Sequence, residues 1–397
     1  MIFRASIDAF TLTPAFAEAV TRLKADPAFA TARIERRDGG IAAAVTSYAD
    51  RTSPQLVIVE EDDDDAALVA RLEQLAECCD GATRVIVVGK INDIHLYRSL
   101  IARGVSDYLV APVGPAQLAD SIIQLLSDPG AARRGRIVAF WGARGGVGAS
   151  TLAQNVADAL GGLLAEPALY LDLDLGFGTS LLAFNMELRQ TVLDALAQPE
   201  RLDPLLLDRL LTAHGERVRV LASPADPRQS LIATLDGIDR LIDMAARMAP
   251  AIVVDLPRLW CDWSDHVLAG ADEIVLVAQP DLASLREAKR FLELVAPRRV
   301  EGAAAPRLVV NKQDCYRKTQ LSPKDFAETL GIQPALVLPF EPVLFGEAAN
   351  NGQMLSEAAK GHKVVQQIAS FAERLAGQGV ARKSRAKANP LLRLLAR

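Results

Sequence analysis

The chain of 397 residues has few of the residues that often mark a specific chemistry. It contains four cysteines and four histidines, and aromatic residues make up only 5%. Cys78 and Cys79 are adjacent, which is poor geometry for a disulfide, and none of the cysteines has the spacing of a metal-binding motif. The sequence therefore predicts reduced thiols, as in the cytosol, and argues against a metal site built from histidine or cysteine.

Long hydrophobic runs and a strong charge imbalance are also missing. No apolar stretch reaches the roughly 18 residues of a spanning helix, and the opening MIFRASIDAF lacks the apolar core of a signal peptide. The 44 Lys and Arg against 49 Asp and Glu give a formal net charge of -5, which disfavours a chain-wide nucleic-acid surface. We expect a cytoplasmic protein with no specific nucleic-acid partner.

Two composition breaks divide the chain. The stretch LLSDPGAARRGR (125–136) joins a turn signal to basic residues just before a new apolar strand, and a basic tail begins after FAERLAGQGV (371–380). These breaks predict a first domain, a linker, a second domain and a tail. Their expected bounds are 1–128, 129–135, 136–375 and 376–397.

Short apolar runs alternate with amphipathic stretches in the first domain. Buried strands are predicted at PQLVIVE (54–60), TRVIVVGK (83–90) and DYLVAP (107–112). Apolar residues at helical spacing fill 66–79 and 115–126. This alternation predicts a parallel sheet covered by helices, and its order resembles a response-regulator receiver domain, which is flavodoxin-like.

The first domain departs from the receiver pattern at the residues that carry receiver chemistry. Glu60 stands at the position of the phosphorylated aspartate, and no acidic pair follows the first strand. Gly89 and Ala111 stand at the switch hydroxyl and the lysine. The departures imply a degenerate receiver without a Mg²⁺ site, used for protein contacts. The acidic run EEDDDD (60–65) is expected to be a solvated loop, with a contact for a basic partner as the alternative.

The second domain opens on a strand, a glycine-rich turn and a helix, RIVAFWGARGGVGASTLAQNVADAL (136–160). Glycines at 145, 146 and 148 let the backbone wrap closely, so that its N–H groups face phosphate oxygens at a helix N-terminus. A hydroxyl at Ser150 is suited to Mg²⁺. The pattern predicts a phosphate-binding loop, and the alternative is a tight turn that holds no ligand.

The loop RGGVGAS resembles the deviant Walker A loop of the ParA/MinD family, which implies a doubly wound, mostly parallel P-loop domain. Arg144 replaces the family's signature lysine, which reaches across a dimer, and Ala149 replaces the lysine that touches the β- and γ-phosphates. Arginine keeps a cation at the first position, whereas alanine removes one at the second. By resemblance the nucleotide contacts are Arg144, Gly145, Gly146, Val147, Gly148, Ala149, Ser150, Thr151 and Asn311.

Three aspartates end strands of the second domain. Asp172 and Asp174 follow ALYL, and Asp255 follows AIVV. Ligands of doubly wound sheets bind at this edge, although an aspartate at a strand end often only caps a turn. The resemblance implies that Asp174 positions the attacking water, that Asp172, Asp255 and Ser150 serve Mg²⁺, and that Asn311 contacts adenine. The implied cofactors are therefore ATP and Mg²⁺.

The combination of a degenerate receiver with a lysine-deficient ParA/MinD-type domain resembles the CpaE/TadZ proteins of Flp/Tad type IV pilus assembly. That resemblance implies a homodimer at a cell pole that recruits pilus assembly and secretion proteins. The tail 381–397 carries six Lys and Arg and no acid, and PLLRLLAR forms a short amphipathic pattern. A solvated tail, a peripheral contact with the inner membrane and a protein partner are all left open for it.

Two functions follow, and the sequence does not choose between them. The first is an ATP-binding scaffold whose nucleotide holds a dimer together, favoured by Ala149. The second is a slow ATPase switch that positions a membrane or polar complex, favoured by Asp174. DNA segregation is disfavoured because the domain lacks an obvious basic face.

Overall fold

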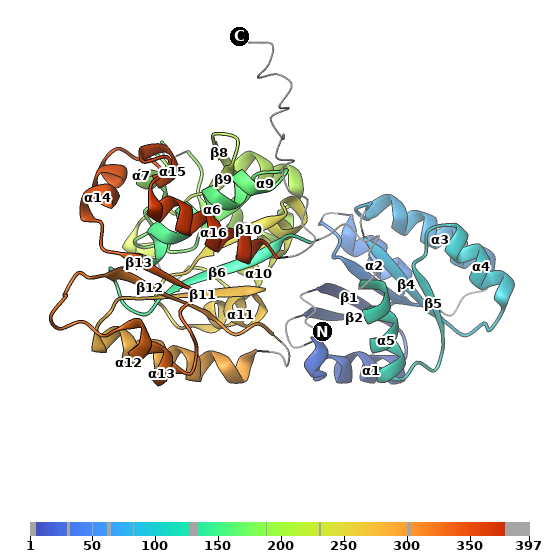
Figure 1. Ribbon diagram of the computed structural model, residues 1–397. Coiled ribbons are helices and arrows are strands. Elements are labelled where there is room, and N and C mark those ends of the chain that lie inside the picture. The colour runs from blue at the N-terminus through green and yellow to red at the C-terminus, as the bar shows by residue number, and fades with distance from the viewer. Residues whose placement is uncertain are drawn as a thin grey trace, which may run out of the picture.

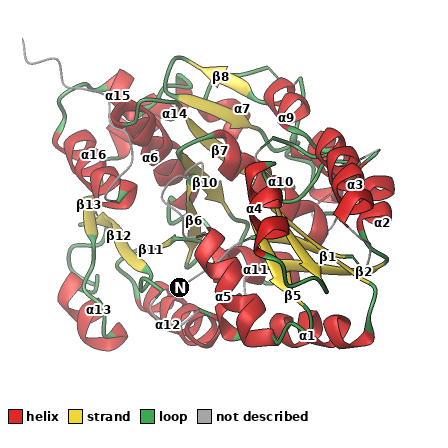
Figure 2. Cartoon of the chain, turned by 90° about the vertical axis from the view of Figure 1, so that its right-hand side faces the viewer, coloured by secondary structure: helices red, strands yellow, loops and turns green. Residues whose placement is uncertain are grey.

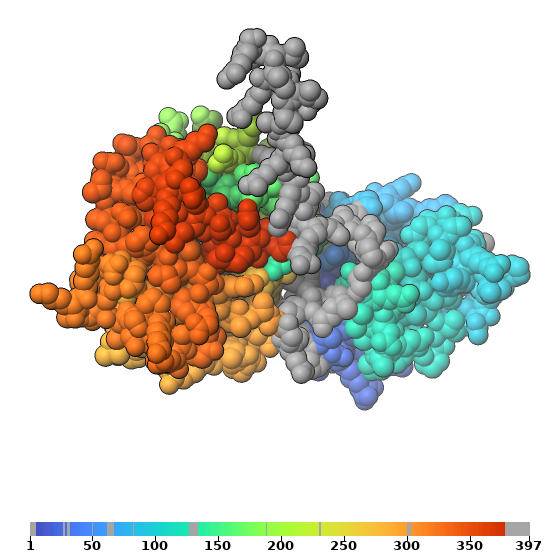
Figure 3. Space-filling view, viewed as in Figure 1, coloured from blue at the N-terminus to red at the C-terminus, as the bar shows by residue number. Residues whose placement is uncertain are grey.

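The computed structural model describes residues 5–29, 32–49, 51–61, 65–81, 83–126, 134–187, 189–229, 232–299 and 303–377. These residues form two lobes, each built on its own sheet (Figures 1 and 3). Most of the predicted linker and the whole of the predicted basic segment 381–397 lie outside the described residues. Within the described part, no helix combines the length and apolarity that crossing a membrane requires.

The first lobe holds a five-stranded sheet in the order β2-β1-β3-β4-β5, in which every pairing is parallel. Its strands are β1 (Ser6–Thr11), β2 (Arg33–Asp38), β3 (Leu56–Glu60), β4 (Arg84–Gly89) and β5 (Asp107–Val110). Its helices are α1 (Pro14–Lys24), α2 (Ile41–Tyr48), α3 (Asp65–Cys78), α4 (Ile94–Ala102) and α5 (Pro115–Leu126).

Helices cover both faces of this sheet, because its central strands β3 and β4 are apolar on both sides. One face packs on α1 and α5, and the other packs on α2, α3 and α4. Alternate residues of β3 supply the two cores, with Leu56 and Ile58 on one side and Val57 and Val59 on the other. Such strands are typical of parallel sheets buried on both faces. The predicted strands and helices of this region are confirmed.

The expectation of a solvated acidic run at 60–65 is wrong for its first two residues. Glu60 and Glu61 are only 5% and 7% exposed. The Glu60 carboxylate accepts hydrogen bonds from the backbone N–H groups of Leu12 and Thr13 at 2.6 and 2.8 Å. It also accepts one from Thr13 Oγ1 at 2.5 Å, and Glu61 pairs with Arg71 at 3.2 Å. These acids are structural, because their partners are supplied by the same domain.

The second lobe holds an eight-stranded sheet in the order β13-β12-β11-β6-β10-β7-β9-β8. Only the pairing of β8 with β9 is antiparallel. The strands are β6 (Arg136–Gly142), β7 (Ala168–Asp172), β8 (Thr212–His214), β9 (Val218–Leu221), β10 (Ala251–Asp255), β11 (Glu273–Ala278), β12 (Arg307–Gln313) and β13 (Leu336–Pro339).

Helices cover both faces of this sheet as well, which confirms the predicted doubly wound, mostly parallel α/β fold (Figure 2). The helices are α6 (Ala149–Leu163), α7 (Ser180–Ala183), α8 (Val192–Leu196), α9 (Pro204–Leu210), α10 (Leu235–Met248), α11 (Asp262–Gly270), α12 (Leu282–Val295), α13 (Pro323–Leu330), α14 (Pro342–Asn350), α15 (Leu355–Ala358) and α16 (Lys363–Ala376). The faces of α6 and α16 share one core, and those of α10, α11 and α12 share the other.

The order of the central strands places a crevice above β6. The chain passes from β6 across β10 to β7, and later from β10 across β6 to β11, so the direction of winding reverses at β6 and β10. In doubly wound sheets such a reversal opens a crevice at the carboxyl ends of the strands. The glycine-rich turn leaves β6 at this point.

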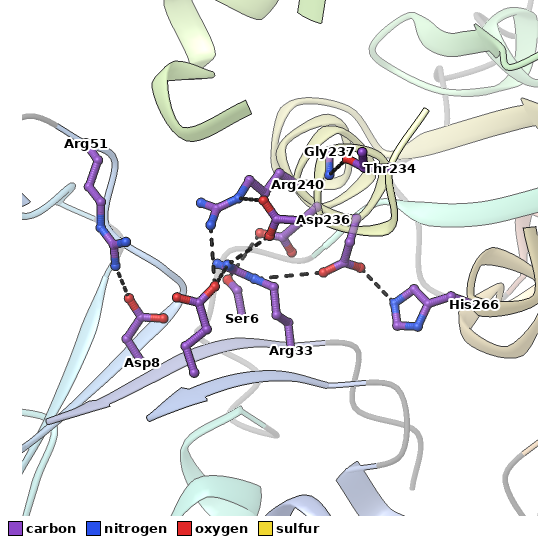
Figure 4. A network of polar contacts seen from close by, with 12 residues as sticks. Ser6, Asp8, Arg33, Arg51, Thr234, Asp236, Gly237, Arg240 and His266 are labelled. Carbon is purple, nitrogen blue, oxygen red and sulfur yellow. Dashed lines mark hydrogen bonds and ion pairs between the residues drawn. The ribbon is translucent and has the colours of Figure 1, made fainter. Parts of the chain in front are cut away.

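The two lobes meet through charged side chains between β1 and β2 on one side and α10 on the other (Figure 4). Arg33 lies 2.5 Å from Glu35 in its own lobe and 3.7 Å from Asp236 in α10. Arg240 of α10 reaches back to Glu35 at 3.4 Å while it pairs with Asp236 at 2.8 Å. The contact is therefore polar, as is common between domains that keep separate cores.

Candidate nucleotide-binding site

A cavity of about 590 Å³ lies at the carboxyl edge of the second sheet. Its size falls within the range of small-molecule sites, roughly 300–1,000 Å³. The walls come from the glycine-rich turn, the segments after β7 and β10, the end of β12 and the segment from β13 into α14. The lining residues are Gly142, Arg144–Thr151, Asp174, Phe177, Thr179, Leu256, Arg258, Asn311, Lys312, Pro339–Pro342, Phe345, Gly346 and Ala349.

The glycine-rich turn has the backbone that a phosphate-binding loop requires. Gly146 and Gly148 have φ values of 77° and 90°, in the left-handed region that side chains disfavour. A Cβ at Gly145 or Gly146 would meet nothing within 4 Å, so the backbone there faces open space. The helix α6 begins at Ala149, and no side chain caps it at Gly148. Its first N–H groups therefore remain available to an anion.

Three side chains hold the carbonyl oxygens of this turn. Asn311 Nδ2 donates to the Val147 oxygen at 2.8 Å, and Lys312 Nζ donates to the Gly146 oxygen at 2.6 Å. Arg258 Nη1 donates to the Ala143 oxygen at 3.3 Å. With its carbonyls held from outside, the turn keeps its shape without a ligand.

Asn311 lies in the cavity wall, where the family resemblance expects it. Its amide is already engaged on both sides, because Nδ2 bonds the turn and Oδ1 accepts from the Lys312 N–H at 2.9 Å. A Cβ at Gly148 would come within 2.6 Å of Asn311 Nδ2, which explains why glycine stands there. The observed role of Asn311 is to hold the turn, and its contact with adenine stays a prediction.

Arg144 is bound within its own chain. Its guanidinium donates to both carboxylate oxygens of Asp281, at 3.1 and 3.2 Å. Asp281 also caps α12, where its carboxylate accepts from the Ser284 N–H at 2.7 Å. The ion pair would have to open before Arg144 could reach a partner subunit, so that reach stays a prediction.

Asp172 and Asp255 lie side by side on β7 and β10, beneath the cavity rather than in its wall. Both are buried, and burial raises the pKa of each carboxyl above its usual range. The Asp172 charge raises the pKa of Asp255 further, while hydrogen bonds from Tyr170 and Ser150 oppose the rise. The Tyr170 hydroxyl donates to Asp255 Oδ2 at 2.8 Å.

The contacts of Asp172 support its alternative role as the cap of a turn. Its two oxygens accept from the N–H groups of Asp174 and Ser180, at 3.2 and 3.1 Å. Asp174, by contrast, lies in the cavity wall, and its own carboxylate accepts from the Phe177 N–H at 3.0 Å. Asp172 therefore shapes the segment that presents Asp174, and its service to Mg²⁺ stays a prediction.

The donor set fits a magnesium–nucleotide better than a free metal ion. No group of three or more His, Cys, Asp or Glu side chains suited to a metal exists among the described residues. The Ser150 hydroxyl lies at Asp255, and Mg²⁺ is commonly bound by one or two protein oxygens together with substrate phosphates and waters. A divalent charge there would also stabilise the ionised forms of the two buried acids.

Sequence analysis did not single out Tyr170, whose hydroxyl bonds Asp255, or Arg258 and Lys312 of the cavity wall. Arg258 follows the end of β10, and Lys312 is the second-last residue of β12, so their position at the carboxyl edge was available from the strand pattern. Tyr170 carried no such signal, because it stands in an apolar run that also suits a core.

Comparison with known proteins shows the fold of the second lobe. No protein-family model matches the chain. The septum site-determining protein MinD of Synechocystis sp. is 24% identical over 264 residues, which is 66% of this chain and 93% of that protein. A ParA family ATPase from Chlorobium tepidum superposes with a TM-score of 0.55 at 24% identity, over 61% of this chain and 98% of the other.

Two further solved structures are similar. MinD of Pyrococcus horikoshii, solved as a complex with Mg-ADP, gives a TM-score of 0.52 at 19% identity, over 61% of this chain and 96% of the other. A pilus assembly protein CpaE from Caulobacter crescentus is 43% identical over 31% of this chain and 99% of its own, with a TM-score of 0.30. The second lobe has the fold of ParA/MinD-type P-loop ATPases.

Proposed function

We propose that this protein is an ATP-binding assembly factor, a dimer held together by Mg-ATP, that positions pilus assembly and secretion proteins at a cell pole. One observation carries the nucleotide part of the proposal. The glycine-rich turn is held in its phosphate-binding shape, with the Ser150 hydroxyl at Asp255 and Asp174 in the cavity wall, while position 149 is alanine.

The missing lysine favours binding over turnover. Phosphoryl transfer is catalysed mainly by positioning and by neutralising the charge that develops on the phosphates. The backbone cradle and the Mg²⁺ ligands contribute to binding in the ground state, and they remain. Ala149 removes a cation from the neutralisation, so hydrolysis is expected to suffer more than affinity.

Exposed apolar side chains around the cavity mouth support a dimer across this face. Phe177 is 71% exposed and lies in the cavity wall, and Val343 of α14 is 69% exposed. Phe340, 43% exposed, lies in the wall with them. Exposed apolar groups gathered at one site are typical of an interaction surface. A nucleotide bound beneath them would be covered by a second copy.

The first lobe supports an assembly role rather than a phosphorelay. Glu60, which stands where a receiver carries its phosphorylated residue, is tied by three hydrogen bonds to residues 12 and 13. Both oxygens of this carboxylate therefore already accept hydrogen bonds from its own domain. The pilus part of the proposal rests on the pairing of such a lobe with a lysine-deficient P-loop lobe.

Asp174 favours a second candidate, a slow ATPase switch. A pure scaffold has no need of a carboxylate in the cavity wall, and Asp174 stands there on a turn shaped by Asp172. In this alternative, hydrolysis would end the dimer and release a polar or membrane-bound complex.

One set of measurements separates the two candidates. The full-length protein is tested for Mg-ATP binding by calorimetry, for dimerisation by light scattering and for phosphate release, beside Asp174→Ala. The proposed scaffold binds and dimerises with ATP and releases no phosphate above the background of the mutant. Turnover that is lost in Asp174→Ala would establish the switch instead, and failure to bind any nucleotide would reject both.

The assembly role is tested separately, with purified pilus secretion components from the same cell. The scaffold requires their capture to increase with Mg-ATP and to fall when the dimer is disrupted by Phe177→Asp. Leu205→Asp is the control, because Leu205 is also exposed, at 60%, but does not line the cavity. If capture of the secretion components depended neither on Mg-ATP nor on the dimer, the assembly role would be contradicted.

A further inference from the structure

The cavity has three cationic side chains in its wall, although its phosphate loop lacks a lysine. They are Arg144, Arg258 and Lys312, and they come from the turn after β6, the segment after β10 and the end of β12. Which of them takes over the charge that Ala149 removes depends on two properties. The cation must be free of a carboxylate partner, and it must lie at the end of the cavity where the reacting phosphate is bound.

Arg144 fails the first requirement. Its guanidinium is held by both oxygens of Asp281, so its charge is neutralised within the chain. Its positive field at the phosphates is correspondingly reduced. Arg144 becomes available only if that pair opens.

Lys312 lies at the other end of the cavity. It follows Asn311 near the end of β12, and in the sheet order β12 lies on the opposite side of β6 from β10 and β7, whose ends lead to Arg258 and Asp174. Its ammonium is engaged with the Gly146 oxygen at 2.6 Å. Lys312 therefore serves the shape of the turn on the side away from Asp174.

Arg258 meets both requirements. It lines the cavity three residues after Asp255 of β10, and β10 lies between β6, which leads into the glycine-rich turn, and β7, which leads to Asp174. Among the described residues it has no ion pair within 4 Å, and its single hydrogen bond is the long one to the Ala143 oxygen. Glu287 is paired with Arg286, at 2.7 Å, and the Arg258 charge also helps to lower the pKa of the Glu287 carboxyl.

We propose that Arg258 is the cation that binds the terminal phosphate of the nucleotide in place of the missing lysine. The inference rests on the proposed nucleotide site and adds to it a residue that selects the triphosphate. A guanidinium presents two parallel N–H donors to a phosphate, which a lysine cannot do. The long bond to the Ala143 carbonyl is readily exchanged for such a pair. Because Arg258 belongs to the segment after β10, loss of the terminal phosphate would release that segment.

The test measures affinities rather than turnover. Full-length protein with Mg²⁺ is titrated with ATP and with ADP by calorimetry, for the unaltered chain, Arg258→Gln and Lys312→Gln. Glutamine keeps an N–H donor for the Ala143 oxygen but removes the charge. Arg258→Gln is expected to weaken ATP binding by about 10- to 100-fold, the usual worth of a charged hydrogen bond, and ADP binding by less than about threefold.

Lys312→Gln is the matched control, since it also removes one cation from the wall. It is expected to weaken ATP and ADP alike, because it acts through the turn that both nucleotides share. A rescue completes the test: Ala149→Lys added to Arg258→Gln should restore at least most of the lost preference for ATP, because it returns the cation to the loop.

The outcomes separate this inference from the function on which it rests. If the unaltered chain binds neither ATP nor ADP, the nucleotide site itself is rejected. If it binds both, and Arg258→Gln weakens them equally or leaves both unchanged, the site stands and the role of Arg258 is wrong. A selective loss for ATP that Ala149→Lys repairs supports the role.

Discussion

The carboxyl edges of the two parallel sheets both border a cavity, of about 320 Å³ in the first lobe and about 590 Å³ in the second, but their polar groups are satisfied differently. At the end of β3, the Glu60 carboxylate is filled by three donors from residues 12 and 13 of its own domain. At the ends of β6, β10 and β12, the backbone and side chains surround a cavity and leave helix N–H groups without a cap. An acid at a strand end therefore indicates a site only when its own chain does not satisfy it.

The difference teaches that a carboxylate at the carboxyl edge of a parallel sheet can serve the fold. In the first lobe the Glu60 carboxylate joins β3 to the start of α1. In the second, side chains from neighbouring strands take over the support of the loop, so the ligand is not required for its shape.

The largest effect is expected from removing the carboxylate at the edge of the first sheet. Glu60→Ala deprives two backbone N–H groups and the Thr13 hydroxyl of a partner that is itself buried, although Leu12 is 46% exposed. We expect the free energy of unfolding of the first lobe to fall by about 3 kcal/mol, because hydrogen bonds to a charged group are worth about 1.5–3 kcal/mol each and water replaces part of the loss. Hydrogen exchange at the amides of Leu12 and Thr13 measures it locally, beside a urea melt.

Glu18→Ala is the control for that experiment, since Glu18 is exposed and pairs only with Arg22 on the surface. It should change stability by less than about 0.5 kcal/mol. Equal stability of Glu60→Ala and the unaltered chain would mean that the hydrogen bonds of Glu60 do not contribute to the stability of the first lobe.

The two buried acids at the carboxyl edge of the second sheet should make stability depend on pH when Mg²⁺ is absent. Burial, with the Asp172 charge beside it, raises the pKa of Asp255 to about 8, so the folded protein retains a proton that the unfolded chain loses near pH 4. Stability should therefore fall as pH rises from about 4 to about 8. Asp255→Asn removes this ionisable group. At pH 8 in EDTA, the free energy of unfolding of this variant should exceed that of the unaltered chain by about 2 kcal/mol.

Urea unfolding from pH 5 to pH 8, with and without Mg²⁺, checks the sign. In Asp255→Asn the free energy of unfolding must decrease less with pH, and Mg²⁺ must stabilise the unaltered chain more than the variant. A chain whose stability rose across this range would show that the two buried acids are stabilised as a charged pair without metal.

A smaller effect is expected from filling the space behind the phosphate loop. Gly148→Ala adds a methyl group where φ is 90° and where Asn311 Nδ2 would lie 2.6 Å away. Either the turn or Asn311 must shift, so nucleotide affinity should fall by about tenfold, for a strain of about 1–3 kcal/mol. Calorimetric titration with Mg-ADP measures the loss.

Gly331→Ala is matched to this change, because Gly331 has φ 69° at the end of α13 and a Cβ there meets nothing within 4 Å. It carries a similar backbone strain at a place outside the cavity. If both substitutions lowered affinity equally, the effect would come from stability and not from the loop.

The smallest effect concerns the contact that joins the two lobes. Arg240→Ala removes the link between Glu35 and Asp236 across the interface. We expect a loss of at most about 1 kcal/mol, which diminishes with salt, because such pairs are partly solvated. Thermal melts of the full chain at low and high salt measure it, and a loss that does not depend on salt would point to packing instead.

The sequence predicted the second lobe better than the contacts inside it. The strands and helices followed from apolar periodicity, and the carboxyl edge followed from the strand order expected of a doubly wound sheet. The partners of Glu60 and Asn311 could not be foreseen, because they lie 47 and 164 residues away in the chain. Asp172 was expected to serve a metal, but only the structure shows that backbone N–H groups occupy both of its oxygens.

Arg258 and Lys312 were missed for a different reason. The loop motif shows only which lysine is absent, and neither Arg258 nor Lys312 belongs to that motif. The strand order places both residues at the carboxyl edge beside the loop. Their signal is their place at the carboxyl ends of β10 and β12, which a loop motif does not include.

The hydrogen bonds from Asn311 and Lys312 to the glycine-rich turn also have a consequence for rates. A loop that already has its binding shape orders little on meeting the nucleotide, so association should be limited by diffusion and orientation rather than by rearrangement. Occupancy would then follow the ratio of ATP to ADP promptly, and residence time would be set by departure alone. The nucleotide bound to such a protein would be set by the ratio of ATP to ADP around it, whereas in a hydrolysing switch it would be set by the rate of hydrolysis.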